Sequence, residues 1–260
     1  MTRSRDIFRV LPQYQPLMRV LGIDAAEVFR HPQIVVWRKL KDRENCTLDA
    51  EFKDKAIRLH IKRYRRPRWF AKPADEEVAG IIALQKAAIP TVPLVGWGRL
   101  SNGRSFVITE DLAGYADAEK LVQSGLPFES LLNSTADLAG MLHNANLHHR
   151  DLYLCHFFAR RDDPNDLRLI DVARVRPMGM MRNRWIVKDL AQFWYSTRSL
   201  ATDEQRDRWL TRYAQRRNLQ ETHALKDAIV RKANWIARHD AKLKRKQPRR
   251  NVSIPSAQVK

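Results

Sequence analysis

Two aspartates and the short segments around them most constrain how this 260-residue chain can fold. Asp151 lies in the sequence HRDLYLCHF, residues 149–157, and Asp171 follows the apolar segment 167–170, twenty positions after Asp151. Transfer of a phosphoryl group to a hydroxyl needs one carboxylate beside the hydroxyl and another that holds the metal on the nucleotide phosphates. A loop that carries the first carboxylate and a strand that ends at the second would supply both groups in this order.

A lysine and a glutamate upstream fit the same chemistry. Residues 56–62 alternate between apolar and polar side chains, which predicts a strand with Lys62 on its polar face. The next segment, residues 75–86, has helical periodicity, and Glu77 falls on its apolar face. A strand lysine, an inward helix glutamate, a catalytic aspartate and a metal-binding aspartate follow one another in this order in kinase-like phosphotransferases.

Each of these residues also has a simpler explanation. Lys62 begins a basic run, and most strand lysines are solvated. Asp151 could cap a turn, and Asp171 could end an ordinary edge strand. Because all four residues occur in this order, the phosphotransferase interpretation is favoured over four unrelated structural roles. His143 and His148 are expected to be surface or packing residues with no role.

The residues around both aspartates resemble the lipopolysaccharide kinase family, the heptose and Kdo kinases of the lipopolysaccharide inner core. Protein kinases usually place an asparagine five positions after the catalytic aspartate, whereas this chain has His156 there, as the heptose-kinase branch tends to. The resemblance covers roughly residues 34–215. Besides residues 149–157 and 169–172, the similar segments are residues 61–64, the Glu77 helix leading to 89–91, and residues 109–112, 188–190 and 203–213.

The residue patterns and the resemblance together predict an α+β, protein-kinase-like fold of two lobes. The N-lobe is a small antiparallel sheet with one main helix, including a hairpin turned at residues 101–104, and the C-lobe is mostly helical. Thr202 is expected to open a helix through a capping box. The expected parts are an N-terminal helical extension (1–30), a nucleotide-binding N-lobe (31–112), a helical C-lobe with the catalytic and metal-binding loops (113–241) and a basic disordered tail (242–260).

The C-lobe residues have distinct expected roles. Asp151 would orient the acceptor hydroxyl and accept its proton, and Arg150 would support the catalytic loop. Asp171 would hold Mg²⁺ on the nucleotide phosphates. His156 would be either a second metal ligand or a structural residue. The structural role is favoured because magnesium prefers oxygen ligands.

The N-lobe residues would bind ATP. Lys62, paired with Glu77, would position the α- and β-phosphates. Glu110 and Leu112 lie where an adenine-contacting hinge is expected. The segment 41–45 stands where a loop would cover the phosphates, yet it has no glycine. Because glycines let backbone amides approach phosphates, Lys and Arg side chains would have to substitute, or the loop would close only over bound nucleotide.

The resemblance implies an ATP-dependent kinase that phosphorylates a sugar hydroxyl, most of all a heptose, on the lipopolysaccharide core attached to lipid A. Two alternatives stay open. One is a kinase-like phosphotransferase with a protein or another small-molecule acceptor. An aminoglycoside would favour an acidic cleft, which the net charge of +19 disfavours. The other is a non-catalytic kinase-fold module that binds anionic membrane, against which the joint presence of all four residues argues.

Charge and hydropathy suggest where the protein acts. Basic residues concentrate in residues 62–72, which also contain Tyr64, Trp69 and Phe70, and in residues 242–260, which contain no acid. Both segments could contact an anionic membrane surface, and no nucleic acid is expected as a partner. No apolar run approaches the roughly 20 residues of a spanning helix, and Cys46 and Cys155 are expected to be reduced thiols. We therefore expect a cytoplasmic enzyme, peripheral on the cytoplasmic face of the inner membrane.

Overall fold

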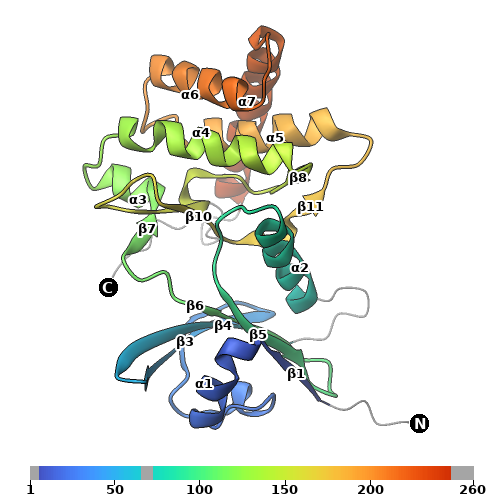
Figure 1. Ribbon diagram of the computed structural model, residues 1–260. Helices are drawn as coiled ribbons and strands as arrows, with labels where there is room; N and C mark the ends of the chain where they lie inside the picture. The colour runs from blue at the N-terminus through green and yellow to red at the C-terminus, as the bar shows by residue number, and fades with distance from the viewer. Residues whose placement is uncertain (1–5, 66–72, 247–260) are drawn as a thin grey trace. The chain divides into compact units, whose positions relative to one another are not determined.

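The computed structural model describes residues 6–65 and 73–246 and divides the chain into two compact units. Unit 1 comprises residues 1–83 and 91–113, and unit 2 comprises residues 84–90 and 114–260. An antiparallel sheet dominates unit 1, and helices dominate unit 2 (Figure 1). The expected α+β, kinase-like fold is confirmed.

Unit 1 is built on a six-stranded antiparallel sheet with the strand order β1-β5-β6-β4-β3-β2. The hairpin between β5 and β6 turns at Gly103, whose φ of 84° suits a residue without a Cβ. The turn expected at residues 101–104 is confirmed. The strands are β1 (Ile7–Val10), β2 (Val35–Lys39), β3 (Arg43–Phe52), β4 (Lys55–Tyr64), β5 (Leu94–Arg99) and β6 (Ser105–Glu110).

The N-terminal segment is not the purely helical extension that the sequence suggested. It begins with the edge strand β1, which pairs antiparallel with β5. Gly98 permits this pairing, because a Cβ at that position would lie 2.2 Å from the carbonyl oxygen of Ile7. The short helices η1 (Pro12–Tyr14), α1 (Gln15–Val20) and η2 (Glu27–Phe29) follow. A four-residue edge strand has no strong local signal, because its pairing with distant residues decides its structure.

The two faces of the sheet have different coverings. Leu59 and Ile61 of β4 are fully buried in a core with Leu17 and Met18 of α1. The helix α2 (Pro73–Lys86) lies on the opposite face, which carries the polar side chains of β4 (Figure 1). The alternation of residues 56–62 therefore sets both the core of unit 1 and the polar surface beneath α2.

The structure describes residues 62–65 of the expected basic segment 62–72, and these residues differ in burial: Arg63 and Tyr64 are buried, whereas Arg65 is exposed. Arg63 is only 5% exposed, and its guanidinium lies 5.9 Å from the ring centroid of Phe29. Its Nη1 lies 3.8 Å from Glu44, which also accepts a hydrogen bond from Arg65. Arg63 continues the apolar face of β4, so a membrane-facing role is wrong for it. Residues 66–72 lie outside the described residues.

Unit 2 contains helices around two small sheets, with the strand orders β10-β9-β7 and β11-β8. Thr202 caps α6 in the predicted capping box: its side chain accepts from Gln205 N, and the Gln205 side chain accepts from Thr202 N. The elements are β7 (Tyr115–Asp117), α3 (Ala118–Gln123), α4 (Glu129–Asn144), β8 (Leu147–His148), η3 (Leu154–His156), β9 (Phe157–Arg160), β10 (Leu167–Leu169), η4 (Val172–Arg174), β11 (Arg176–Pro177), α5 (Arg182–Ser196), α6 (Asp203–Arg216) and α7 (His223–Lys246).

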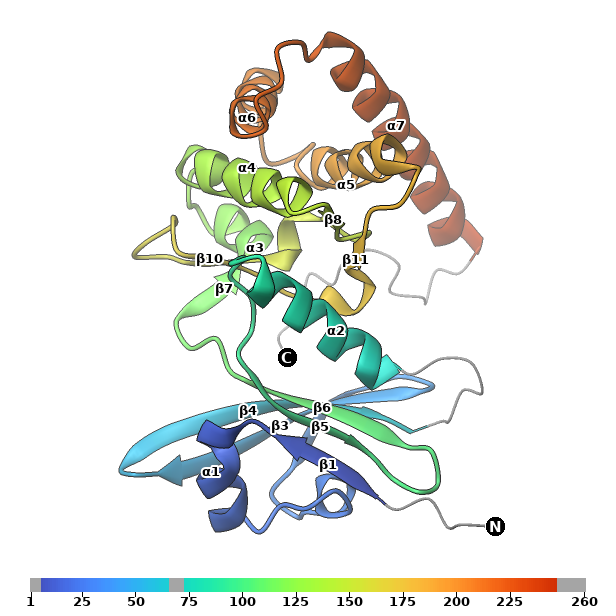
Figure 2. The ribbon, with the colours of Figure 1, turned by 45° about the vertical axis from the view of Figure 1, so that its right-hand side comes forward.

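Trp209 connects the helices α4, α5 and α6 of unit 2. Phe193 of α5 stacks on Trp209 of α6 with ring centroids 4.1 Å apart, and Trp209 donates a hydrogen bond to Thr135 of α4. The helix α7 runs along α5 (Figure 2) and continues to Lys246, so the expected start of the tail at residue 242 is wrong. Residues 247–260 lie outside the described residues. None of the described helices is long and apolar enough to span a bilayer.

Candidate functional site

Unit 1 holds the predicted lysine–glutamate pair. Lys62 donates to Glu77, with Nζ 2.5 Å from Oε1. Tyr64, on the same face of β4, donates its hydroxyl hydrogen to Oε2 at 2.8 Å. Glu77 is 4% exposed, so strand and helix hold both oxygens of a buried carboxylate. The structure brings the two predicted residues together, whereas the role of Tyr64 was missed because Tyr64 lies beyond the alternating segment considered.

The turn between β2 and β3 stands where a phosphate-covering loop was expected. Leu40 N donates to Arg43 O at 2.8 Å, and Arg65 N donates to Asp42 O at 3.0 Å. The turn is thus closed by backbone hydrogen bonds to β3 and to the end of β4. Side chains, and not a glycine-rich backbone, are what this turn offers to a phosphate.

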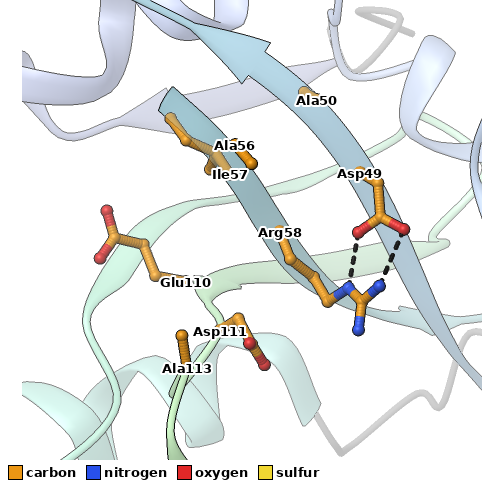
Figure 3. Close-up of a pocket in the computed structure, with 8 residues that line it drawn as sticks. All are labelled: Asp49, Ala50, Ala56, Ile57, Arg58, Glu110, Asp111 and Ala113. Atoms are coloured by element: carbon orange, nitrogen blue, oxygen red, sulfur yellow. Dashed lines mark hydrogen bonds and ion pairs between the residues drawn. The ribbon is translucent and has the colours of Figure 1, made fainter. Parts of the chain in front are cut away.

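A pocket of about 460 Å³ lies beside the end of β6 (Figure 3). Its volume falls in the range of small-molecule sites. Glu110 lines this pocket and accepts a hydrogen bond from Tyr14, whose pKa is raised by burial and by this carboxylate. Leu112 is half-buried and is not among the lining residues. The full lining is Asp49, Ala50, Ala56, Ile57, Arg58, Glu110, Asp111 and Ala113.

The polar side chains around the pocket are paired with one another. Arg58 Nε lies 2.5 Å from Oδ1 of Asp49, and Figure 3 shows this ion pair across β3 and β4. His60 Nε2 lies 2.7 Å from Oδ1 of Asp111. The Asp111 backbone amide also donates to Arg58 O at 2.9 Å, so the segment after β6 is fixed against β4. These bonds hold the predicted hinge in a single position within unit 1.

In unit 2, Asp151 presents its carboxylate near the surface. Arg174 Nη1 lies 2.9 Å from Oδ2 and 3.1 Å from Oδ1 of Asp151. The Asp151 side chain is 22% exposed and that of Arg174 is 62% exposed. A hydroxyl can therefore approach this carboxylate from solvent, as a general base requires. Arg174 was missed, although it follows Asp171 by only three positions.

One face of α5 holds the backbone of the Asp151 loop. Asp189 accepts from His149 N at 2.7 Å and from Arg150 N at 2.8 Å. Gln192 accepts from the amide of residue 152 and donates to the carbonyl of residue 150, and Ser196 Oγ accepts from the amide of residue 154. These three α5 side chains lie three and four positions apart, so one helical face bonds the amides of residues 149, 150, 152 and 154.

Asp189 is the anchor of this arrangement. Its side chain is fully buried, and Oδ2 lies 3.4 Å from Nε2 of His143. Burial pushes the pKa of Asp189 upward, but the His143 ring and the His149 amide outweigh it and hold the pKa below its usual range. His143 also bonds the hydroxyl of Tyr213 at 2.7 Å. His143 is thus a buried packing residue, as expected, while the position of Asp189 was not predicted.

Arg150 lies in the left-handed region of backbone conformation, with φ of 71°. Its guanidinium carbon lies 5.0 Å from the ring centroid of Trp185, and His148 stacks on the same ring at 4.6 Å. Lys188 Nζ lies 5.6 Å from the centroid of this ring, and burial lowers the pKa of Lys188. The indole therefore holds Arg150 by a cation–π contact, which fits a supporting role for Arg150 in the loop. His148 proves to be a packing residue.

Asp171 also has a left-handed backbone, with φ of 55° and ψ of 48°. The preceding residue is fixed on both sides, because Ile170 N donates to His156 O at 3.0 Å and Ile170 O accepts from His149 Nε2 at 3.1 Å. His156 Nδ1 lies 2.6 Å from the carbonyl oxygen of Asp151, which can only accept, so Nδ1 carries the hydrogen. His156 Nε2 lies 3.8 Å from Oδ2 of Asp171. His156 thus links both predicted loops.

Asp171 fits a magnesium–nucleotide complex better than a protein-only metal site. No group of three or more His, Cys, Asp or Glu side chains in residues 6–65 and 73–246 is arranged to hold a metal ion. Magnesium commonly uses one or two carboxylates, with substrate phosphates and water completing its shell. The Asp171 side chain is 40% exposed and offers such a carboxylate. The bond of His156 to the Asp151 backbone favours its structural role.

Cys46, Cys155 and His149 are buried. Both cysteines are free and buried, as expected, and burial raises the pKa of the Cys46 and Cys155 thiols. Burial chiefly lowers the pKa of His149, and its Nδ1 is buried without a hydrogen-bond partner among the described residues. His149 is therefore neutral and serves to position Ile170.

Known proteins are similar to this chain in sequence and fold. The profile of the "Lipopolysaccharide kinase (Kdo/WaaP) family" matches residues 37–223. The lipopolysaccharide core heptose(I) kinase WaaP of Pseudomonas aeruginosa is 29% identical over 252 residues, which cover 87% of this chain and 92% of that protein. WaaP of Escherichia coli is 26% identical over 198 residues, covering 67% and 74%.

Two solved structures extend this comparison. WaaP in complex with acyl carrier protein has a TM-score of 0.67 and 26% identity, covering 88% of this chain and 99% of that one. An aminoglycoside-3'-phosphotransferase of type VIII has a TM-score of 0.55 and 15% identity, covering 82% and 95%. The second likeness concerns the fold alone.

Proposed function

The chain belongs to the lipopolysaccharide kinase (Kdo/WaaP) family, and we propose that it transfers the γ-phosphoryl group of ATP to a heptose hydroxyl of the lipopolysaccharide inner core. One observation carries the choice of heptose: the curated relatives that match this chain along most of their length are core heptose(I) kinases. We place the enzyme on the cytoplasmic face of the inner membrane, where ATP is available and the acceptor is attached to lipid A.

The residues of unit 2 would act on the acceptor. Asp151 orients the sugar hydroxyl and accepts its proton as the phosphoryl group transfers. Arg150 supports the loop through the indole of Trp185. Asp171 would hold Mg²⁺, which neutralises charge on the nucleotide phosphates, and His156 ties the Asp171 and Asp151 loops together.

The residues of unit 1 would bind ATP. Lys62, held by Glu77, contacts the α- and β-phosphates as a point charge. Glu110 and Leu112 belong to the segment that would contact adenine, and the pocket lined by Glu110 supports this assignment. The turn without glycine would cover the phosphates with side chains, so nucleotide affinity depends more on Lys62 than it would beneath a glycine-rich loop.

Phosphate incorporation from labelled ATP into a panel of acceptors tests this proposal. The panel contains heptose-bearing core dephosphorylated beforehand, core truncated before the heptose, a protein mixture and an aminoglycoside. We expect incorporation that requires both the heptose and a divalent metal. Equal labelling of the truncated core would move the acceptor to another sugar, and labelling of protein or aminoglycoside alone would overturn the proposal.

An acyl carrier protein is a second partner that we propose to test, because the solved WaaP structure is a complex with that protein. Co-migration of the purified chain with acyl carrier protein in gel filtration would support the partnership. Separate elution at concentrations above the micromolar range would contradict it.

A further inference from the structure

The outward side of α7 carries a line of cations around one tryptophan, which we call the α7 stripe. At about 100° per residue, positions separated by three and four fall on one side of a helix. The members of the stripe are all exposed: Arg231, Trp235, Arg238, Lys242 and Arg245. Trp235 is 50% exposed, and Lys232 Nζ lies 3.7 Å from its ring centroid.

The opposite side of α7 fixes the direction in which the stripe points. Ile229 and Ala233 are fully buried. Tyr195 of α5 donates its hydroxyl hydrogen to Asp240 at 2.6 Å. The helix α7 is thus locked onto α5, whose other face holds the Asp151 loop. A surface bound through the stripe would therefore be connected to the catalytic loop by one rigid helix.

Only one exposed acid of α7 lies on the side of the stripe: Asp227, four positions before Arg231. Asp240 is the only acid between residues 231 and 246, and it points to Tyr195 and pairs with Lys244 at 3.1 Å. The helix dipole favours cations in the last turn, which accounts for Arg245. It does not account for Arg231, which lies almost four turns earlier, nor for the exposed ring of Trp235.

We propose that the α7 stripe is a docking surface for an anionic lipid bilayer. A straight line of cations about 21 Å long fits a planar array of headgroup phosphates. The ring of Trp235, which stacks on His239 with centroids 5.3 Å apart, is half exposed and suits the membrane interface, where amphipathic rings prefer to lie. To bind here instead, an acidic protein would need a row of carboxylates spaced to match the cations of this rigid helix. The inference rests on the proposed function only in that a lipid A-linked acceptor lies in such a membrane.

Sedimentation of the full chain with vesicles tests the stripe. The test variant replaces the four cations of the stripe with Gln. The matched control removes the same number of exposed charges from other elements, by Gln replacement of Arg9, Arg19, Arg30 and Lys86. The vesicles contain phosphatidylcholine with phosphatidylglycerol, or phosphatidylcholine alone. Circular dichroism and thermal melting establish that both variants stay folded, as exposed replacements should.

We expect wild type and the control variant to bind the anionic vesicles and not the neutral ones. The stripe variant should partition on the order of 10²-fold more weakly, and added salt should weaken wild-type binding in the same way. Trp235→Ser should weaken binding by about tenfold, whereas Ser at the similarly exposed Trp37 should not.

Three outcomes would overturn the docking surface. These are equal binding by the stripe variant and wild type, equal binding of wild type to neutral lipid, and absence of vesicle binding while an acidic protein is retained through the stripe. The last would identify the occupant as that protein. Because sedimentation needs neither ATP nor acceptor, these outcomes leave the proposed phosphoryl transfer untouched. Transfer to a soluble heptose acceptor should be the same in the stripe variant and wild type.

Discussion

Two residues in the predicted functional loops have a backbone conformation that residues other than glycine rarely adopt. Arg150 and Asp171 both have positive φ, which costs about 1–3 kcal/mol when the surrounding structure imposes it. The Asp189 carboxylate fixes the Arg150 amide, and the two bonds of Ile170 fix the approach to Asp171. Strain at both loops, held by buried partners, is consistent with groups positioned for chemistry before the substrate binds.

Substitution at the two aspartates should separate chemistry from nucleotide binding. We expect Asp151→Asn to bind MgATP normally in calorimetric titration and to lose transfer by on the order of 10²-fold or more, because it lacks a basic oxygen. Asp171→Ala should lose the magnesium dependence of ATP binding. Glu204→Gln, at an exposed position on α6, is the control and should change neither quantity. Near-normal turnover by Asp151→Asn would show that Asp151 only caps its loop.

At the scale of elements, α5 is the part of unit 2 whose side chains bond the backbone of the Asp151 loop. Asp189→Ala would leave the buried amides of His149 and Arg150 without acceptors, at about 1–3 kcal/mol each. We expect the free energy of unfolding to fall by about 2–6 kcal/mol, measured by chemical denaturation. Asp189→Asn keeps an acceptor oxygen and should lose less. Equal stability of the alanine variant and wild type would contradict the anchoring role.

Local periodicity explains which elements could be predicted. The strand carrying Lys62, the Glu77 helix and the Thr202 capping box follow from side chains a few positions apart. The position of Asp189 had a comparable signal, since it lies with Ile186, Leu190 and Phe193 on an apolar helical face. A single carboxylate on such a face indicates buried partners.

Other features could not be predicted because they depend on distant residues. The strand β1 exists through its pairing with β5, and the stacking of Trp185 on His148 depends on how α5 meets β8. Arg63 lies within a basic run, and only its register with the apolar positions of β4 indicated that it is buried. The basic composition of the segment thus suggested that Arg63 is solvated, whereas the alternation along β4 places Arg63 in the core.

At the scale of the whole molecule, the proposed reaction needs groups from both units. Unit 1 supplies the Lys62–Glu77 pair and the pocket at the end of β6, and unit 2 supplies both aspartates. Each half is organised internally by its own buried carboxylate, Glu77 in one and Asp189 in the other. Loss of either carboxylate should therefore disable the enzyme through a different unit, nucleotide binding in the first case and loop geometry in the second.

Two buried histidines should make the stability of unit 2 depend on pH. His143 and His149 are fully buried, and burial is the main cause that lowers the pKa of each. Their folded-state pKa values lie below the unfolded value of about 6.5, so the unfolded chain takes up protons first as the pH falls. Their contribution is thus complete above pH 6.5 and declines at lower pH, before the more acidic Asp189 begins to protonate.

Denaturant unfolding of the full chain between about pH 8 and pH 5 measures this effect. Each neutral histidine should cost about 1.4 kcal/mol of unfolding free energy for every pH unit between its unfolded pKa and its lower folded pKa. The His143→Gln variant should unfold more easily than wild type at pH 8. Its stability should also depend less on pH, because only one of the two buried histidines with a lowered pKa remains. His223→Gln alters a side chain that is 89% exposed and should leave the slope unchanged. A stability that stays constant from pH 7 to pH 5 would contradict the neutral, buried state of both rings and, with it, the hydrogen-bond pattern that positions Ile170 before Asp171.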